Sequence, residues 1–172
     1  GLQDEETALR VEASVIDLIG LSKLTNKKSG YKSSNYGRMS VEQIISLHAS
    51  SEVTIEEPSL LIRINREFRY GMSPIELYDA TRGVWKIGMN REKVKYAFAV
   101  YGAVVQEVYE VMTWLPAGST FSTRGNLECP DRWEFIGKVA PENIRKKYIF
   151  KNVSRYFNKN SQNPFLYVNI EA

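Results

Sequence analysis

The spacing of apolar residues changes from a helical period to an extended one near residue 59. Residues 5–26, EETALRVEASVIDLIGLSKLTN, follow the helical period, with Asp4 placed to cap the helix and Gly20 placed to end it. Glu12 interrupts the face that is otherwise apolar, which consists of Ala8, Val15, Ile16 and Ile19. A carboxylate at such a position has no obvious role in packing.

A polar segment follows this helix. Residues 27–40, KKSGYKSSNYGRMS, have no periodicity and are typical of an exposed linker. Ser40 then opens a short predicted helix, VEQIISLHA, and His48 lies at the end of that helix with no second metal-ligand type beside it. Pro58 marks the boundary with the next region.

From residue 59 onward the pattern predicts strands with helices set between them. LLIRIN alternates as a half-buried strand does, and Ser73, Pro74 and Glu76 form a helix-start signature before IELYDAT. Gly102 predicts a bulge or bend within YAFAVYGAVVQEVYEVMTW. The remaining predicted elements are GVWKIG, RWEFIGKV, PENIRKKYI and PFLYVNI. About six strands with two or three helices predict an α/β fold of the α+β type, with a small curved mixed sheet or partial barrel.

Composition sets limits on the kind of protein. The chain has 172 residues, 43% apolar and 12% aromatic, so we expect a real core within one domain or one domain with an appendage. A single cysteine, Cys129, excludes an internal disulfide and favours a reducing, cytoplasmic setting. The lone histidine leaves no zinc cluster. The sequence contains no apolar run of the roughly 18 residues that a membrane span needs, so we expect a soluble protein without a membrane partner.

Positive charge is concentrated in the second part of the sequence. Residues 1–58 carry 6 Lys and Arg against 9 Asp and Glu, whereas residues 59–172 carry 17 against 11. No acid lies between Glu142 and Glu171. Lysines and arginines neutralise phosphates and aromatic rings stack on bases, so this combination is what a nucleic-acid surface needs. The alternative is a solvated basic helix above a core of aromatic residues.

Two further segments are candidates for binding. In ATRGVWKIG, Gly83 permits close backbone approach, and Trp85 between Arg82 and Lys86 can form the wall of a base pocket, although a core tryptophan fits the pattern equally well. MTWLPAGSTFSTRGNLECPD is a long polar loop of a kind that is often functional. The predicted nucleic-acid-binding residues are Arg82, Trp85, Lys86, Arg145, Lys146, Lys147, Tyr148, Lys151, Arg155 and Tyr156.

The opening helix also carries a resemblance to a known family. ALRVEASVIDLIGLSKLTN resembles the closing segment of the GIY-YIG endonuclease fold, and this resemblance implies that Glu12 is the metal-ligand position and Asn26 the motif asparagine. The segments LLIRINREFRYGMSPIELYDATRGVWKIG, RKKYIFKNVSRYF and QNPFLYVN look like the region behind a GIY-YIG module in uncharacterised bacterial proteins. The order of strands and helices is similar to that of PUA-like barrels, by analogy only.

The departures from the family limit what the resemblance implies. The Tyr and Gly motifs of the two name-giving strands and the helix arginine do not occur in this sequence. A complete GIY-YIG domain implies Mg²⁺, but a lone carboxylate cannot hold the ion well or activate a nucleophile. We therefore expect Glu12 to be an orphaned ligand and this chain to need no cofactor and to be inactive as a nuclease.

The expected organisation has three parts: a remnant of a GIY-YIG nuclease domain at residues 1–26, a linker with a short helix at 27–54, and a curved-sheet domain at 55–172. The expected function is binding of DNA or RNA by an accessory domain of a GIY-YIG-type endonuclease. The alternative is a protein-interaction or structural domain with no affinity for nucleic acid.

Overall fold

The computed structural model describes residues 4–19, 41–125, 129–158 and 163–170. Its α-helices are α1 (Glu5–Ile19), α3 (Val41–Ala49), α4 (Pro74–Arg82) and α5 (Glu142–Tyr148), with short 3₁₀ turns η2 (Met89–Lys93) and η3 (Ser154–Tyr156). The strands are β1 (Ser59–Arg63), β2 (Gly83–Trp85), β3 (Tyr96–Tyr101), β4 (Val104–Pro116), β5 (Trp133–Val139) and β6 (Phe165–Val168). The mixed α/β class with a curved sheet is confirmed.

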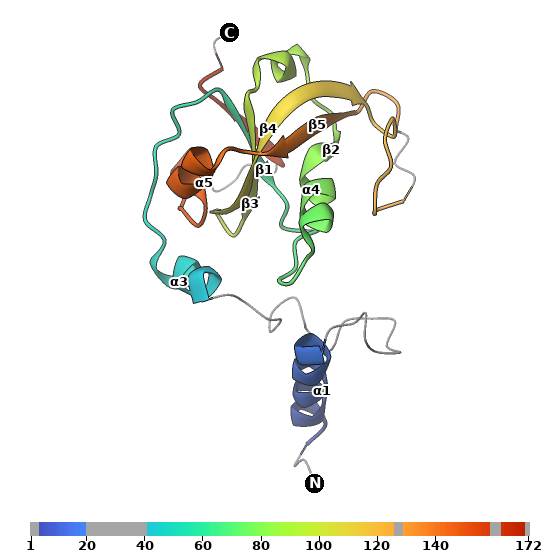
Figure 1. Cartoon of the computed structure of the whole chain (residues 1–172), viewed down its shortest axis with the longest axis vertical. Helices are drawn as coiled ribbons and strands as arrows, with labels where there is room; N and C mark the ends of the chain where they lie inside the picture. Colours follow the sequence, from blue (N-terminus) through green and yellow to red (C-terminus); the bar gives the residue numbers. More distant parts are fainter. Residues whose placement is uncertain (1–3, 20–40, 126–128, 159–162, 171–172) are drawn as a thin grey trace.

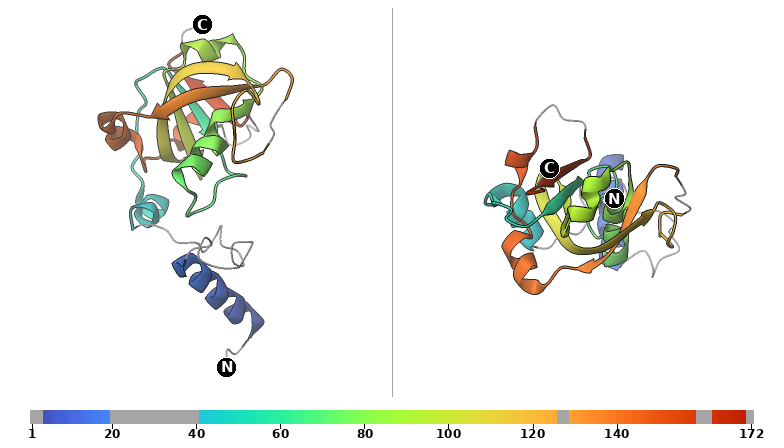
Figure 2. Two further views of the ribbon diagram at one scale, coloured as in Figure 1. Left: turned by 45° about the vertical axis from the view of Figure 1, so that its right-hand side comes forward. Right: turned by 90° about the horizontal axis from the view of Figure 1, so that it is seen from above.

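The strands form one strongly curled mixed sheet. Its order is β2-β5-β4-β3-β1-β6, with β1 parallel to β3 and the other neighbours antiparallel. The views in Figure 1 and Figure 2 show the long β4–β5 pair curving around the remaining strands. As a result the two end strands meet through side chains, since the rings of Trp85 and Phe165 are 6.4 Å apart. The sheet is therefore a half-barrel, as predicted.

Apolar side chains fill both faces of this sheet. On one face Tyr148 of α5 packs edge-on against Phe98, with ring centroids 5.1 Å apart. On the other face Tyr78 of α4 contacts Phe135. Strand β1 lies between the two cores, because Leu61 enters the first and Leu60 the second. The prediction of a half-buried strand at this point was therefore wrong: a central strand with neighbours on both sides and helices on both faces is fully buried.

The caps at the starts of α4 and α1 form as the sequence predicts, whereas Gly102 has a different role from the one expected. Ser73 and Glu76 form the complete capping box of α4, and the Asp4 carboxylate accepts a hydrogen bond from the Thr7 N–H at 2.7 Å. Gly102 marks a tight turn rather than a bulge within one strand: Gly102 and Ala103 both have positive φ and separate β3 from β4. A two-residue turn of this kind joins antiparallel strands with the usual twist.

A break in the β4–β5 pairing helps to curl the sheet. The register shifts between Val111 and Thr113, opposite Gly137. A Cβ at Gly137 would lie 2.5 Å from the Glu110 carbonyl oxygen, so only glycine allows the strands to approach this closely. The Gly137 N–H donates to the Tyr78 hydroxyl at 2.8 Å. At this bulge the Tyr78 side chain of α4 thus takes the place of the neighbouring strand as the hydrogen-bond partner of the Gly137 N–H.

The segment before β1 belongs with the sheet. Glu52 pairs with Asn152, and the Asn152 N–H donates to Ser51 O, so residues 51–54, predicted as the end of a linker, contact the chain after α5. In α1, Glu12 is exposed. Asn26, Ser40 and the predicted linker at 27–40 lie outside the described residues.

Candidate nucleic-acid interface

The segment at residues 117–125, which we call the anchored loop, follows β4 and rests on buried charged residues. Arg82 at the end of α4 is only 4% exposed, and its Nε donates to the Asp79 carboxylate at 2.7 Å. These two residues are three positions apart on one helix, where side chains face the same side. Glu134 of β5 is also buried, and its carboxylate lies 3.7 Å from Arg82 Nη1. Two carboxylates therefore flank one guanidinium.

Each carboxylate binds the anchored loop directly. Glu134 accepts hydrogen bonds from the Gly118 N–H at 3.3 Å and from the Thr120 N–H and hydroxyl, each at 2.9 Å. Asp79 accepts from the Thr123 N–H and hydroxyl, each at 2.7 Å. Buried carboxylates need such donors, because an ionised group without them is strongly disfavoured in the interior. The donors fix the backbone of the loop at three points.

The electrostatics of Asp79 follow from these contacts. Burial in itself raises the pKa of this carboxyl, but the hydrogen bonds from Thr123 and the pairing with Arg82 outweigh burial. The pKa of Asp79 therefore lies below its usual range, and the group is ionised at neutral pH. The positive charge of Arg82 is therefore paired with the carboxylates of Asp79 and Glu134 inside the protein. This placement contradicts the prediction that Arg82 contacts phosphate.

Phe121 lies between the fixed points of the loop. Its carbonyl oxygen accepts a hydrogen bond from Arg82 Nη2, while its side chain is 89% exposed. Isolated exposed apolar residues are common on protein surfaces. This one differs because buried ionic groups hold the backbone on both sides of it. The loop presents an aromatic ring to solvent from a fixed backbone.

Cationic side chains surround β2 beside this loop. Arg124 Nη1 donates to Gly83 O at 2.7 Å, and Arg132 Nη1 donates to Val84 O at 3.1 Å, so both guanidinium groups are held on neighbouring carbonyls of β2. Lys86 follows β2 and is exposed, as is Arg132. Glu67 lies 3.5 Å from Arg124. Arg124 Nη1 also donates to Asp79 O at 3.4 Å. A guanidinium has five N–H donors, so Arg132, bonded to one carbonyl, keeps others for a phosphate.

Trp85 is partly a core residue and partly a surface residue. Its Nε1–H donates to Thr81 O at 2.8 Å, and its ring packs edge-on against Phe165 at the edge of the second core. The ring is half-buried. The interpretation of Trp85 as a core residue describes this packing, whereas its role as the wall of a base pocket stays a prediction. The remaining exposed part lies on the same strand that Arg124 and Arg132 contact.

The cationic residues in and after α5, which we call the basic run, are partly neutralised by acids; they are Arg145, Lys146, Lys147, Lys151 and Arg155. Arg145 makes a two-fold contact with Glu107, with both distances 2.9 Å, and Lys147 lies 2.6 Å from Glu56. Hydrogen bonds to these carboxylates raise the pKa of both Arg145 and Lys147. Tyr148 is 0% exposed and its hydroxyl donates to Glu57. The prediction that the ring of Tyr148 stacks on a base was therefore wrong, because neither ring face is accessible.

The other members of the run are closer to solvent. Lys146 and Arg155 are exposed, whereas the Lys151 ammonium donates to the Ser51 hydroxyl. The hydroxyl of Tyr156 accepts a hydrogen bond from the Ile55 N–H, and its half-buried ring lies under the Arg155 guanidinium. Tyr156 is therefore tied to the core by its hydroxyl, and one ring face is already occupied by a cation.

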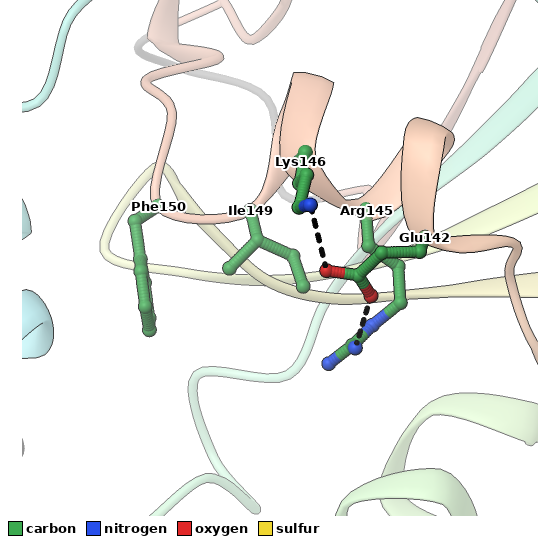
Figure 3. A pocket seen from close by; sticks show the side chains of 5 residues that line it. All are labelled: Glu142, Arg145, Lys146, Ile149 and Phe150. Carbon is green, nitrogen blue, oxygen red and sulfur yellow. Dashed lines mark hydrogen bonds and ion pairs between the residues drawn. The ribbon is translucent and has the colours of Figure 1, made fainter.

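A shallow depression lies beside α5. It is lined by Glu142, Arg145, Lys146, Ile149 and Phe150. Figure 3 shows the Glu142 carboxylate between the Arg145 and Lys146 side chains, at 3.1 and 3.9 Å from their nitrogens. A carboxylate in this position repels phosphate, and Arg145 is already bonded to Glu107. The depression is therefore poorly suited to anions.

The α1 carboxylate does not belong to a metal site in the described residues. Within the ranges that the structure describes, no three His, Cys, Asp or Glu side chains are grouped so that they could hold a metal ion. Glu12 is exposed on α1. The residues described do not fit the Mg²⁺ site of a complete GIY-YIG domain.

Among the described residues, no helix combines the length and the apolar character that crossing a bilayer requires.

Comparisons with known proteins found no matching family model, no matching curated protein and no matching solved structure. The GIY-YIG and PUA-like resemblances therefore stay predictions.

Sequence reasoning missed the residues that hold the anchored loop. Asp79 and Glu134 were not identified as candidates, and Phe121, Arg124 and Arg132 were included only within a long loop. Two signals in the sequence pointed to Glu134 and Asp79. Glu134 lies between Trp133 and Phe135 in a predicted strand, and Asp79 precedes Arg82 by three residues in a predicted helix.

Proposed function

We propose that this chain is a nucleic-acid-binding domain whose interface is the surface around β2 and the anchored loop. The observation that carries this proposal is the pairing of Arg124 and Arg132 with consecutive carbonyls, Gly83 O and Val84 O. Guanidinium groups held in place lose little side-chain entropy when they bind a phosphate. Lys86 adds an exposed ammonium immediately beyond β2.

The proposal moves the interface away from the basic run. Near α5, Arg145, Lys146 and Lys147 lie beside Glu107, Glu142 and Glu56, whereas the ion pairs among the described residues include neither Lys86 nor Arg132. In Figure 1, α5 and the loop between β4 and β5 lie at opposite sides of the sheet, and Figure 2 agrees. One short oligonucleotide is thus expected to contact the β2 side alone.

The proposed role follows the family resemblance. We propose that the domain brings nucleic acid to a nuclease of the GIY-YIG type, with the chemistry supplied by residues other than those described. In this proposal the domain itself contributes phosphate contacts and the exposed parts of the Trp85 and Phe121 rings. It takes no part in cleavage.

The test is fluorescence anisotropy with duplex and single-stranded oligonucleotides at several salt concentrations. The double variant Lys86→Gln, Arg132→Gln removes two phosphate contacts and is expected to flatten the dependence of log affinity on log salt by about 1.8 for duplex. The matched control is Lys138→Gln, Lys146→Gln, which removes the same charge from exposed lysines elsewhere.

The two variants distinguish three outcomes. A smaller slope in the β2 variant alone supports the proposed interface. A smaller slope in the control alone contradicts it and assigns binding to the surface near α5. If the unmodified chain binds no oligonucleotide even at low salt, the proposed function is wrong and the protein-interaction alternative takes its place.

A further inference from the structure

The exposed ring of Phe121 calls for an explanation beyond phosphate binding. Phe121 has the most exposed side chain among the large apolar residues described, at 89%. The residues beside it in the anchored loop, Ser119, Thr120, Ser122 and Thr123, are small and polar. Their side chains and backbone bond to the protein rather than covering the ring.

Three buried charged residues hold the loop that carries this exposed ring. Arg82, Asp79 and Glu134 are each at least nine-tenths buried, and all three bond to the anchored loop. Buried ion pairs contribute little net stability compared with apolar residues of similar size, because desolvation offsets their attraction. Their effect here is positional. They hold the backbone of residues 118–123 so that Phe121 projects outward.

The charge around the ring indicates which kind of partner it contacts. Arg124 is three residues from Phe121, Arg124 and Arg132 both contact β2, and the exposed Lys86 directly follows that strand. No acidic residue occurs in residues 117–125. Minor-groove-binding proteins combine cationic side chains with an apolar side chain that inserts between base steps, and the anchored loop carries an exposed apolar ring and, three residues on, an arginine.

We propose that Phe121 is a wedge that inserts into the base stack of nucleic acid bound at the β2 surface. The inference rests on the proposed function and adds a ligand class: nucleic acid with a step that unstacks easily, such as a mismatch or a single-nucleotide bulge. Unstacking such a step requires less energy than unstacking a matched one. The domain therefore binds distorted duplex more tightly than regular duplex.

The experiment uses a duplex with 2-aminopurine beside a single mismatch, and the same duplex fully matched. The fluorescence of this base analogue rises when neighbouring bases unstack. With the unmodified chain, we expect a fluorescence increase on the mismatched duplex and tighter binding to it than to the matched one. Phe121→Ala is expected to abolish the increase and to weaken binding to the mismatched duplex about 10-fold.

Two control variants test whether the effect depends on the aromatic ring of Phe121. Phe121→Trp preserves a flat ring and should retain the fluorescence increase. Met89→Ala removes another apolar side chain, 71% exposed, and should leave fluorescence and affinity unchanged. Because Phe121 is exposed, Phe121→Ala should melt at the temperature of the unmodified chain, so lost binding cannot be attributed to unfolding.

The failure of this inference differs from the failure of the proposed function. If the unmodified chain binds and Phe121→Ala binds both duplexes equally well with the same fluorescence, the wedge is wrong while phosphate binding at β2 stands. If the unmodified chain binds neither duplex at low salt, both proposals are wrong, and Phe121 becomes a candidate contact for a protein partner.

Discussion

Trp85 and Phe165 pack edge-on with their ring centroids 6.4 Å apart, although their strands lie at opposite ends of the six-stranded sheet. No other ring pair in the described residues joins β2 to β6. The sheet does not close by hydrogen bonds between these strands. Its two ends are joined by aromatic packing instead.

The first prediction tests this contact. Trp85→Ala should lower the free energy of unfolding by about 2 kcal/mol, less than the about 3 to 5 kcal/mol of a fully buried tryptophan, because the ring is half-buried. A double-mutant cycle with Phe165→Ala should give a coupling of about 1 kcal/mol. The measurement is denaturant unfolding. Unchanged stability together with lost oligonucleotide binding would show that Trp85 acts mainly as a ligand contact.

The second prediction concerns Arg82. Arg82→Met leaves the Asp79 and Glu134 carboxylates buried without their cation, and should lower the free energy of unfolding by about 3 to 5 kcal/mol. Arg82→Lys should also be destabilising, because one ammonium cannot reach all the acceptors that the planar group reaches. The exposed neighbour Lys86→Met is the control and should change stability by less than about 0.5 kcal/mol. Equal effects of the two methionine variants would contradict the assignment.

The third prediction is a dependence of stability on pH. The pKa of Asp79 in the folded protein lies below its ordinary value of 3.8. Its contribution to stability is therefore complete above that ordinary value and is lost as the pH falls through the folded pKa. Unfolding followed between pH 7 and pH 2 should show Asp79→Asn losing less stability in acid than the unmodified chain. Asp131→Asn, which changes an exposed carboxyl, should keep the full acid dependence.

The fourth prediction compares two tyrosine hydroxyls. The Tyr78 hydroxyl accepts the Gly137 N–H at the β4–β5 bulge, so Tyr78→Phe leaves that N–H without a partner and should cost about 1 to 2 kcal/mol. The Tyr167 hydroxyl is buried and has no hydrogen-bond partner. Tyr167→Phe should therefore be neutral or stabilising. Thermal melts of the two variants give the comparison, and a larger loss for Tyr167→Phe would contradict it.

The fifth prediction concerns Glu12. The chain should show no Mg²⁺-dependent cleavage of plasmid or oligonucleotide, because the described residues offer no group of metal ligands around this carboxylate. Glu12→Ala should leave stability unchanged, since Glu12 is exposed on α1. Cleavage that disappears in Glu12→Ala would show that Glu12 is a working ligand.

Features that depend on a few neighbouring residues were predictable. The Ser73–Glu76 capping box depends on residues close in sequence, where spacing and conformational preference are sufficient. At Gly102 the glycine marked a change of direction, but the predicted bulge or bend is a two-residue turn between two strands. The number of strands followed from alternation and from turn residues. The burial of β1 on both faces did not follow, because it depends on which strands and helices become its neighbours.

The candidate site was less predictable because its contacts are distant in sequence. Lys147 and Glu56 are 91 positions apart in the sequence but form an ion pair in the structure. Part of the basic run is therefore neutralised by acids that its own sequence does not contain. Arg82 next to a glycine and a tryptophan resembled a binding residue, but Asp79 and Glu134 make it internal. Sequence alone does not show which cations are matched by distant carboxylates.

The position of β1 also determines when the sheet can form during protein synthesis. Among the strands of the described residues β1 comes first, yet it pairs with β6, which is made last of them: Ser59 lies opposite Val168. The ribosome must therefore release β6 before β1 gains its second neighbour. Until then one edge of β1 exposes unpaired N–H and C=O groups, and a nascent chain stalled before residue 165 should be recognised by chaperones and easily cleaved by proteases.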